Sequence, residues 1–209
     1  MPQTILLLPG LTVALVYLWA TQKPPSVWRS VIKTVPVASF AMAAAFAGAP
    51  WLLCAALGLS AVGDLALSRP GERAFLAGLG AFACAHLAFI ALFWAAGSGN
   101  VPLAPAIALV ALGLSTERWL IPHVGALRWP VRAYIAVIVG MGVAATMVNS
   151  AVLVLGAGCF IVSDLILALH LFRLAEGHPL KNPAARALWV LYIAAQALIF
   201  AAFFPTSLP

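Results

Sequence analysis

Eight apolar segments, each close to the length that crosses a lipid bilayer, occupy almost the whole chain. A bilayer core of about 30 Å needs about 20 apolar residues in helical form. Because lipid offers no partner to an unpaired backbone group, such segments are expected to be α-helices. The sequence therefore predicts an all-α, polytopic membrane protein with eight transmembrane helices in one integral membrane domain, residues 1–209. The segments are 4–20, 30–48, 50–68, 73–96, 101–116, 130–149, 151–173 and 184–205.

The composition excludes a water-soluble fold. The chain is 65% hydrophobic and only 8% charged, whereas a soluble domain carries about 25% charged residues. The longest connection, residues 117–129, is predicted to be a loop or a short interfacial helix. A cleavable signal peptide begins with a basic region, and no basic residue precedes the first apolar segment. This segment is therefore predicted to be a retained helix.

The basic residues predict how the helices are oriented. All 11 lysines and arginines lie at or beside the first, third, fifth and seventh connections. The positive-inside rule then places these four connections in the cytoplasm and both termini outside. The net charge of +6 is explained by this topology, so no nucleic-acid partner is expected. The membrane expected for such a chain is the inner membrane of a bacterium.

Two of the five acidic residues, Asp64 and Asp164, lie inside apolar segments. An ionised carboxylate in hydrocarbon is costly unless it is paired or hydrated, so an acid retained there indicates a functional site. Two carboxyls that face one polar pocket can serve as general acid and general base, and either aspartate could take either role. The plainer interpretation is that each carboxyl only holds helices together through hydrogen bonds.

The two aspartates also belong to a weak internal repeat. Gly63-Asp64 in the third segment matches Ser163-Asp164 in the seventh, and the two segments run in the same direction. At about 1.5 Å per residue, each acid is expected about 21 Å from the outer face. The pattern favours two parallel halves of four helices, a 4+4 pseudo-repeat, with the site between the halves.

Six further residues are candidates for a substrate pocket around the aspartates. Lys33 lies near a helix end, where its ammonium either reaches the headgroups or turns inward as a counter-charge. The candidates are Lys33, His86, Tyr134, Ser163, Tyr192 and Gln196. For the histidine, the two tyrosines and the glutamine among them, the plainer interpretation is an interhelical hydrogen bond. The other polar residues that could line a cavity are Ser60, Thr146, Asn149 and Ser150.

The sequence gives no support to a metal centre. A zinc site needs three or four convergent ligands, and no His-x₃-His or comparable spacing occurs in the chain. No metal or other cofactor is therefore predicted.

Five short motifs occur in order along the chain from Lys33 to Gln196. They are Lys33-Thr34-Val35-Pro36-Val37; Phe75-x-x-Gly78 with Phe82 and His86; Pro130-Val131-x-x-Tyr134 with Met141; Tyr192-Ile193-Ala194-Ala195-Gln196; and the aspartate pair, Gly63-Asp64 with Phe160–Ala168 and Phe172. In these motifs the chain resembles the YhhN family of membrane lysoplasmalogenases. The resemblance implies a hydrolase that cleaves the vinyl ether of a lysoplasmalogen, with Asp64 and Asp164 as its catalytic pair. The products would be a fatty aldehyde and a glycerophospho-ethanolamine or -choline.

The implied chemistry suits two carboxyls. Protonation of the β-carbon of a vinyl ether gives an oxocarbenium ion, water adds, and the hemiacetal collapses to aldehyde and alcohol. These steps need a proton donor, a stabilising carboxylate and a base for water. A lysophospholipid within the bilayer could slide between helices, leaving its phosphate near Lys33 or a loop arginine.

Two other functions are compatible with the same residues. A small transporter or proton-coupled carrier would also retain intramembrane acids in a duplicated fold, and it would be expected to have helices broken at the midplane. A zinc-dependent lipid amidase is the other enzyme alternative.

Overall fold

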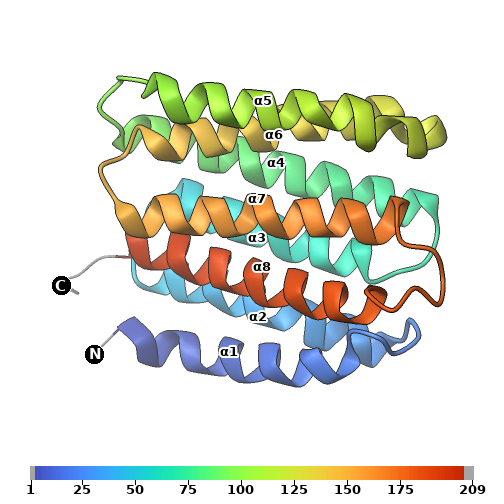
Figure 1. Ribbon diagram of the computed structural model, residues 1–209. Helices are drawn as coiled ribbons and strands as arrows, with labels where there is room; N and C mark the ends of the chain where they lie inside the picture. The colour runs from blue at the N-terminus through green and yellow to red at the C-terminus, as the bar shows by residue number, and fades with distance from the viewer. Residues whose placement is uncertain (1–2, 205–209) are drawn as a thin grey trace.

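The computed structural model describes the backbone of residues 3–204, with side chains from Leu7 to Phe204, and these residues form eight α-helices (Figure 1). No strand occurs between residues 3 and 204, so the all-α prediction is confirmed. Two 3₁₀ turns, η1 (Ile121–His123) and η2 (Gly125–Leu127), lie in the predicted connection 117–129. The α-helices are α1 (Gln3–Ala20), α2 (Val27–Phe46), α3 (Trp51–Leu67), α4 (Glu72–Ala96), α5 (Leu103–Trp119), α6 (Arg128–Thr146), α7 (Ala151–Phe172) and α8 (Lys181–Phe203).

Each predicted segment coincides with one helix, and the ends differ by a few residues. The helix α2 starts earlier than predicted because Ser26 caps it, its hydroxyl accepting a hydrogen bond from the Arg29 amide at 3.2 Å. A serine at this position satisfies an amide that the first turn would leave unpaired. Residue 205, the predicted end of the last segment, lies outside the described residues.

The described part of the chain includes five helical stretches that are long and apolar enough to cross a membrane. They are Glu72–Ala96, Leu103–His123, Gly125–Thr146, Ala151–Phe172 and Lys181–Phe203. Two shorter apolar helices, Leu7–Ala20 and Trp51–Leu67, accompany them. The chain is therefore an integral membrane protein. The structure thus contains eight helices at the predicted positions, and within the searched, described residues five helical stretches meet the length and hydropathy expected of a membrane span.

Successive helices alternate in direction, as Figure 1 shows. The connections that follow α1, α3, α5 and α7 lie at one end of the bundle, on the right of the picture. The start of α1 and the end of α8 lie at the opposite end. The four connections with nearby basic residues therefore share one end of the molecule.

Contacts between helices that are distant in the sequence join the two halves of the bundle. The last helix, α8, packs against α1, α2 and α3, and α4 packs against α6. The indole of Trp189 on α8 donates a hydrogen bond to the Ala14 carbonyl on α1 at 2.9 Å. The helix α5, at the top edge of the bundle in Figure 1, packs mainly against α6 and η1.

Three aromatic rings from three helices meet in the interior. The ring centroid of Tyr192 on α8 lies 5.8 Å from that of Phe82 on α4 and 5.5 Å from that of Phe160 on α7. Edge-to-face pairs of this kind stabilise a core by about 0.5–1.5 kcal/mol each beyond their burial. Helix α3 packs closely against these rings at Gly63, because a Cβ atom added to this glycine would lie only 2.6 Å from the Phe82 ring. This close fit brings Asp64, the next residue on α3, to the centre of the bundle.

Candidate active site

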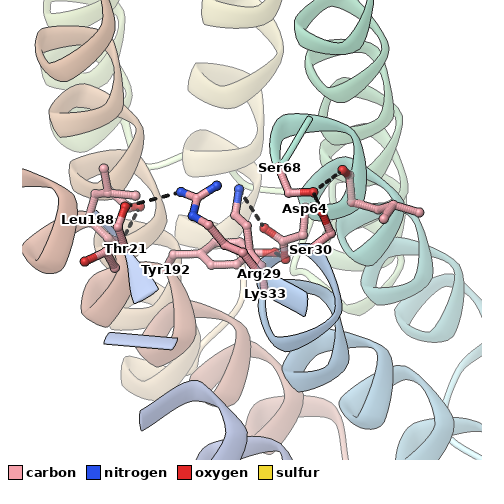
Figure 2. A network of polar contacts seen from close by, with 10 residues as sticks. Thr21, Arg29, Ser30, Lys33, Asp64, Ser68, Leu188 and Tyr192 are labelled. Carbon is pink, nitrogen blue, oxygen red and sulfur yellow. Dashed lines mark hydrogen bonds and ion pairs between the residues drawn. The ribbon is translucent and has the colours of Figure 1, made fainter. Parts of the chain in front are cut away.

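Asp64 lies in the interior with 2% of its side chain exposed, and two groups reach it from other helices (Figure 2). Tyr192 of α8 donates its hydroxyl to Oδ2 at 2.6 Å. Lys33 of α2 places its Nζ 3.7 Å from Oδ1. Of the two interpretations of Lys33, the inward counter-charge is the one observed. A buried carboxylate needs such a partner, because an uncompensated charge in the interior is strongly destabilising.

The first turns of α2 direct Lys33 inward. Arg29, one turn earlier, faces the connection and donates to the carbonyls of Ala20 at 3.1 Å and Thr21 at 3.3 Å (Figure 2). The Ser68 hydroxyl donates to that of Ser30 at 2.7 Å, which joins α3 to α2 beside the site. With Arg29 at the boundary and α2 fixed against α3, the next turn of α2 presents its ammonium to Asp64.

Asp164 lies on α7 and has a related but different set of partners. Tyr134 of α6 donates its hydroxyl to Oδ2 at 2.5 Å. His86 of α4 is fully buried, with Nε2 3.1 Å from that hydroxyl oxygen and 3.8 Å from the carboxyl Oδ2. The tyrosine proton is directed at the carboxyl, so its oxygen accepts from His86. A neutral imidazole then carries its hydrogen on Nε2.

The two carboxyls have the same kind of support in unlike electrostatic surroundings. Each accepts a tyrosine hydroxyl and has one nitrogen group nearby. The nitrogen beside Asp64 belongs to the amine of Lys33, whereas the one beside Asp164 belongs to the imidazole of His86. Asp164 is also the more accessible of the two, with 15% of its side chain exposed. Carboxyls in unlike surroundings can divide acid and base roles.

One cavity is lined by both aspartates. Lys33, Tyr134, Ser163 and Tyr192 also line it. Most of the remaining wall is apolar and comes from α4, α5, α6 and α7. The Ser163 hydroxyl donates to the Leu188 carbonyl at 2.9 Å and so joins α7 to α8. This hydrogen bond goes to a backbone carbonyl and not to a basic side chain that would activate the serine as a nucleophile. The cavity therefore places two carboxyls, one ammonium and two phenols at the wall of a largely apolar chamber.

Two predicted pocket residues lie behind this wall. His86 does not line the cavity, but it contacts Tyr134, which does. Gln196 is fully buried one helical turn beyond Tyr192. Both side chains lie in the interior, but the geometry gives them no direct contact with a ligand in the cavity.

The other polar candidates are also outside the cavity wall. Ser60 is buried one turn before Asp64. Thr146 donates to the carbonyl of Val143 in its own helix at 2.7 Å. Ser150 caps α7 by accepting from the Leu153 amide at 3.3 Å. Asn149 lies in the connection before α7. Of the five polar residues expected at a cavity, counting Ser163, only Ser163 lines it.

The apolar wall contains residues of two kinds: some belong to a sequence motif, and others were not singled out by any feature of the sequence. Phe75 and Phe82 belong to a recognised motif, and both line the cavity. Leu112, Gly113 and Thr116 of α5 also line it, although α5 has no intramembrane charge and no motif. Only the packing of α5 against α6 places these residues beside the aspartates.

Two structural features bear on the alternative functions. The helices that carry the aspartates, α3 and α7, are continuous through Asp64 and Asp164, whereas a transporter was expected to have helices broken at the midplane. Among the described residues, no three His, Cys, Asp or Glu side chains lie close enough together to hold a metal ion.

Similarity to known proteins extends over most of the chain. The family model described as the YhhN family matches residues 28–203. Two curated proteins named lysoplasmalogenase, from Mycobacterium bovis and Mycobacterium tuberculosis, are each 35% identical to the chain over 165 residues. The alignment covers 74% of this chain and 60% of each relative, so the chain spans less than two thirds of the relatives' length. No solved structure matches the chain.

Proposed function

Because the chain belongs to the YhhN family, we propose that it is a membrane hydrolase that cleaves the vinyl ether bond of lysoplasmalogens. The observation that carries the proposal is that Asp64 and Asp164 line the same, largely apolar cavity. The name of the two mycobacterial relatives supports the same reaction. The products are a fatty aldehyde and glycerophospho-ethanolamine or glycerophosphocholine.

In the proposed mechanism, Asp164 is the acid. Its carboxyl gives a proton to the β-carbon of the vinyl ether, and the α-carbon and ether oxygen then share the positive charge as an oxocarbenium ion. The Asp64 carboxylate, whose charge is balanced by Lys33 at 3.7 Å, stabilises that cation. Water attacks the α-carbon and returns a proton to Asp164, which restores the acid. The hemiacetal then collapses to the aldehyde and the glycerol hydroxyl, with no net gain or loss of protons.

The tyrosines and the histidine position these groups in the proposed mechanism. Tyr192 and Tyr134 each hold one carboxyl oxygen in place through a hydroxyl. His86 holds Tyr134 from the side away from the cavity. Fixing a catalytic carboxyl in this way lowers the entropy lost on reaching the transition state. Gln196 is assigned to the buried shell behind Tyr192.

The proposed membrane topology is a bundle in which all eight helices cross the bilayer, with both termini outside and the basic connections in the cytoplasm of a bacterial inner membrane. The alternating helix directions and the shared end of the basic connections support it. The partners of the aspartates also fit a 4+4 repeat. Each aspartate, on the third helix of one half, is held by the second helix of its own half and the fourth helix of the other.

The substrate assignment is tested by aldehyde release from purified protein in detergent. We expect aldehyde from lysoplasmenyl-ethanolamine or -choline, and none from the matched lysolipid with a saturated ether, because that molecule has no double bond to protonate. An ester lysolipid, which is cleaved through a tetrahedral intermediate, is expected to release no fatty acid. The assignment would be wrong if the saturated ether or the ester were cleaved as fast as the vinyl ether, or if no vinyl-ether lysolipid released aldehyde.

A further inference from the structure

The cavity that holds the aspartates is continuous with the outer surface of the helix bundle. Its wall includes Asp64, which is almost completely buried. The same wall includes Leu112 of α5 and Leu171 of α7, which are 36% and 46% exposed. Both leucines lie on helices long and apolar enough to cross a membrane. In the proposed membrane topology, the exposed side of the cavity therefore faces hydrocarbon rather than water.

The exposed lining residues place the opening between α5 and α7, with α6 behind it, and we call this opening the slot. The helix α6 packs against both neighbours and supplies the back wall, including Tyr134. Towards the start of α7 the slot is closed at Gly142 of α6. A Cβ there would lie 2.7 Å from Ile161 of α7 and 3.2 Å from Leu109 of α5, so the three helices converge at this level. Nearer the end that carries the basic connections, Leu112 and Leu165 face the cavity from the two sides.

We propose that the hydrocarbon chain of the substrate enters the site sideways from the bilayer through this slot between α5 and α7. The inference rests on the proposed function and adds the route and the residues that admit the chain. A vinyl ether lies where the hydrocarbon chain joins the glycerol, so a chain must extend away from whichever carboxyl protonates it. The apolar wall suits methylene groups, whereas burying a phosphate there without a partner would be costly. The chain therefore occupies the slot, and the headgroup points towards the basic connections.

The slot is tested by narrowing it at Leu112. In Leu112→Trp, we expect kcat/KM for a long-chain lysoplasmalogen to fall about tenfold or more, because the larger ring overfills the slot. A short-chain vinyl-ether analogue, which does not fill the slot, should keep kcat/KM within about twofold of wild type. Ile107→Trp, at a 66% exposed position of α5 outside the cavity wall, is the matched control and should leave both substrates unaffected. An equal loss of kcat/KM for the long-chain and short-chain substrates, or no loss for either, would overturn the proposal.

A second measurement does not depend on turnover or on the stability of a variant. A lysolipid with a saturated ether and a photoreactive diazirine on its chain is irradiated with the wild-type protein, and cross-linked peptides are mapped by mass spectrometry. We expect cross-links in residues 109–116 of α5 and 161–171 of α7. Cross-links confined to other helices, or none, would overturn the slot. Cross-links in the slot without cleavage of any vinyl ether would instead reject the proposed function.

Discussion

Replacing either aspartate by asparagine is expected to lower kcat for aldehyde release by about 10²–10⁴-fold. An amide has nearly the same shape as a carboxyl, but it can neither donate the proton to carbon nor carry the negative charge that faces the cation. Asp64→Asn removes the charge next to Lys33, and Asp164→Asn removes the proposed proton donor. The measurement is aldehyde release in detergent at saturating lysoplasmalogen, with KM determined alongside kcat.

The matched control for these variants is Glu72→Gln. Glu72 is exposed in the first turn of α4 and does not line the cavity, so kcat should remain within about twofold of wild type. The kcat of the double variant Asp64→Asn/Asp164→Asn should be close to that of the less active single variant, because the effects of substituting residues that act as a unit are not additive. Full activity in both single variants would show that the carboxyls only join helices, and the proposed mechanism would be rejected.

The second large effect is expected from Lys33→Met, and it concerns stability as well as activity. Removing the ammonium leaves the Asp64 carboxylate buried with a tyrosine hydroxyl as its only other polar partner among the described residues. Breaking a buried ion pair in this way typically costs about 3–5 kcal/mol. The free energy of unfolding, measured by titration with a denaturing detergent, should fall by an amount in that range.

The double variant Lys33→Met/Asp64→Asn separates the two roles of the ion pair. With both charges removed, no uncompensated charge remains, so most of the lost stability should return while activity stays low. Lys23→Met, in the exposed connection between α1 and α2, should change the free energy of unfolding by less than about 0.5 kcal/mol. If the double variant were as unstable as Lys33→Met, the ion pair would not be the source of the loss.

Helix positions were largely predictable from the sequence because lipid restricts the backbone so strongly. Apolar length and the spacing of basic residues are local properties, and both can be read without knowing which helices touch. The first turn of α2 was less predictable, because it depends on the hydrogen bond between Ser26 and the Arg29 amide. The connection between α5 and α6 was predicted as a loop or a short interfacial helix, and it contains two 3₁₀ turns.

That Asp64 and Asp164 mark a candidate site could be proposed from energetics, since an ionised carboxyl in hydrocarbon is costly unless it is paired or hydrated. Which polar groups meet could not, because that depends on contacts between distant helices. Tyr192 reaches Asp64 across 128 positions of sequence, and His86 lies 48 positions from the Tyr134 that it supports. The inward direction of Lys33 depends in turn on Arg29 being held at the helix boundary.

The apolar wall could not be predicted at all, because nothing distinguishes a leucine in a slot from one that faces lipid. Leu112 and Ile107 are similar residues on the same helix. Only the packing of α5 on α6 makes one of them a wall of the cavity and leaves the other outside it.

Transfer of a proton from the cavity to the β-carbon of a vinyl ether is the step on which the proposed mechanism depends. It can be followed by running the reaction in D₂O and trapping the aldehyde at once by reduction to the alcohol. Mass spectrometry of the wild-type product should find one deuterium at the carbon next to the former carbonyl, and the Asp164→Asn protein should form this product far more slowly. Product with no deuterium at that carbon would contradict protonation of the vinyl ether and, with it, the proposed role of Asp164.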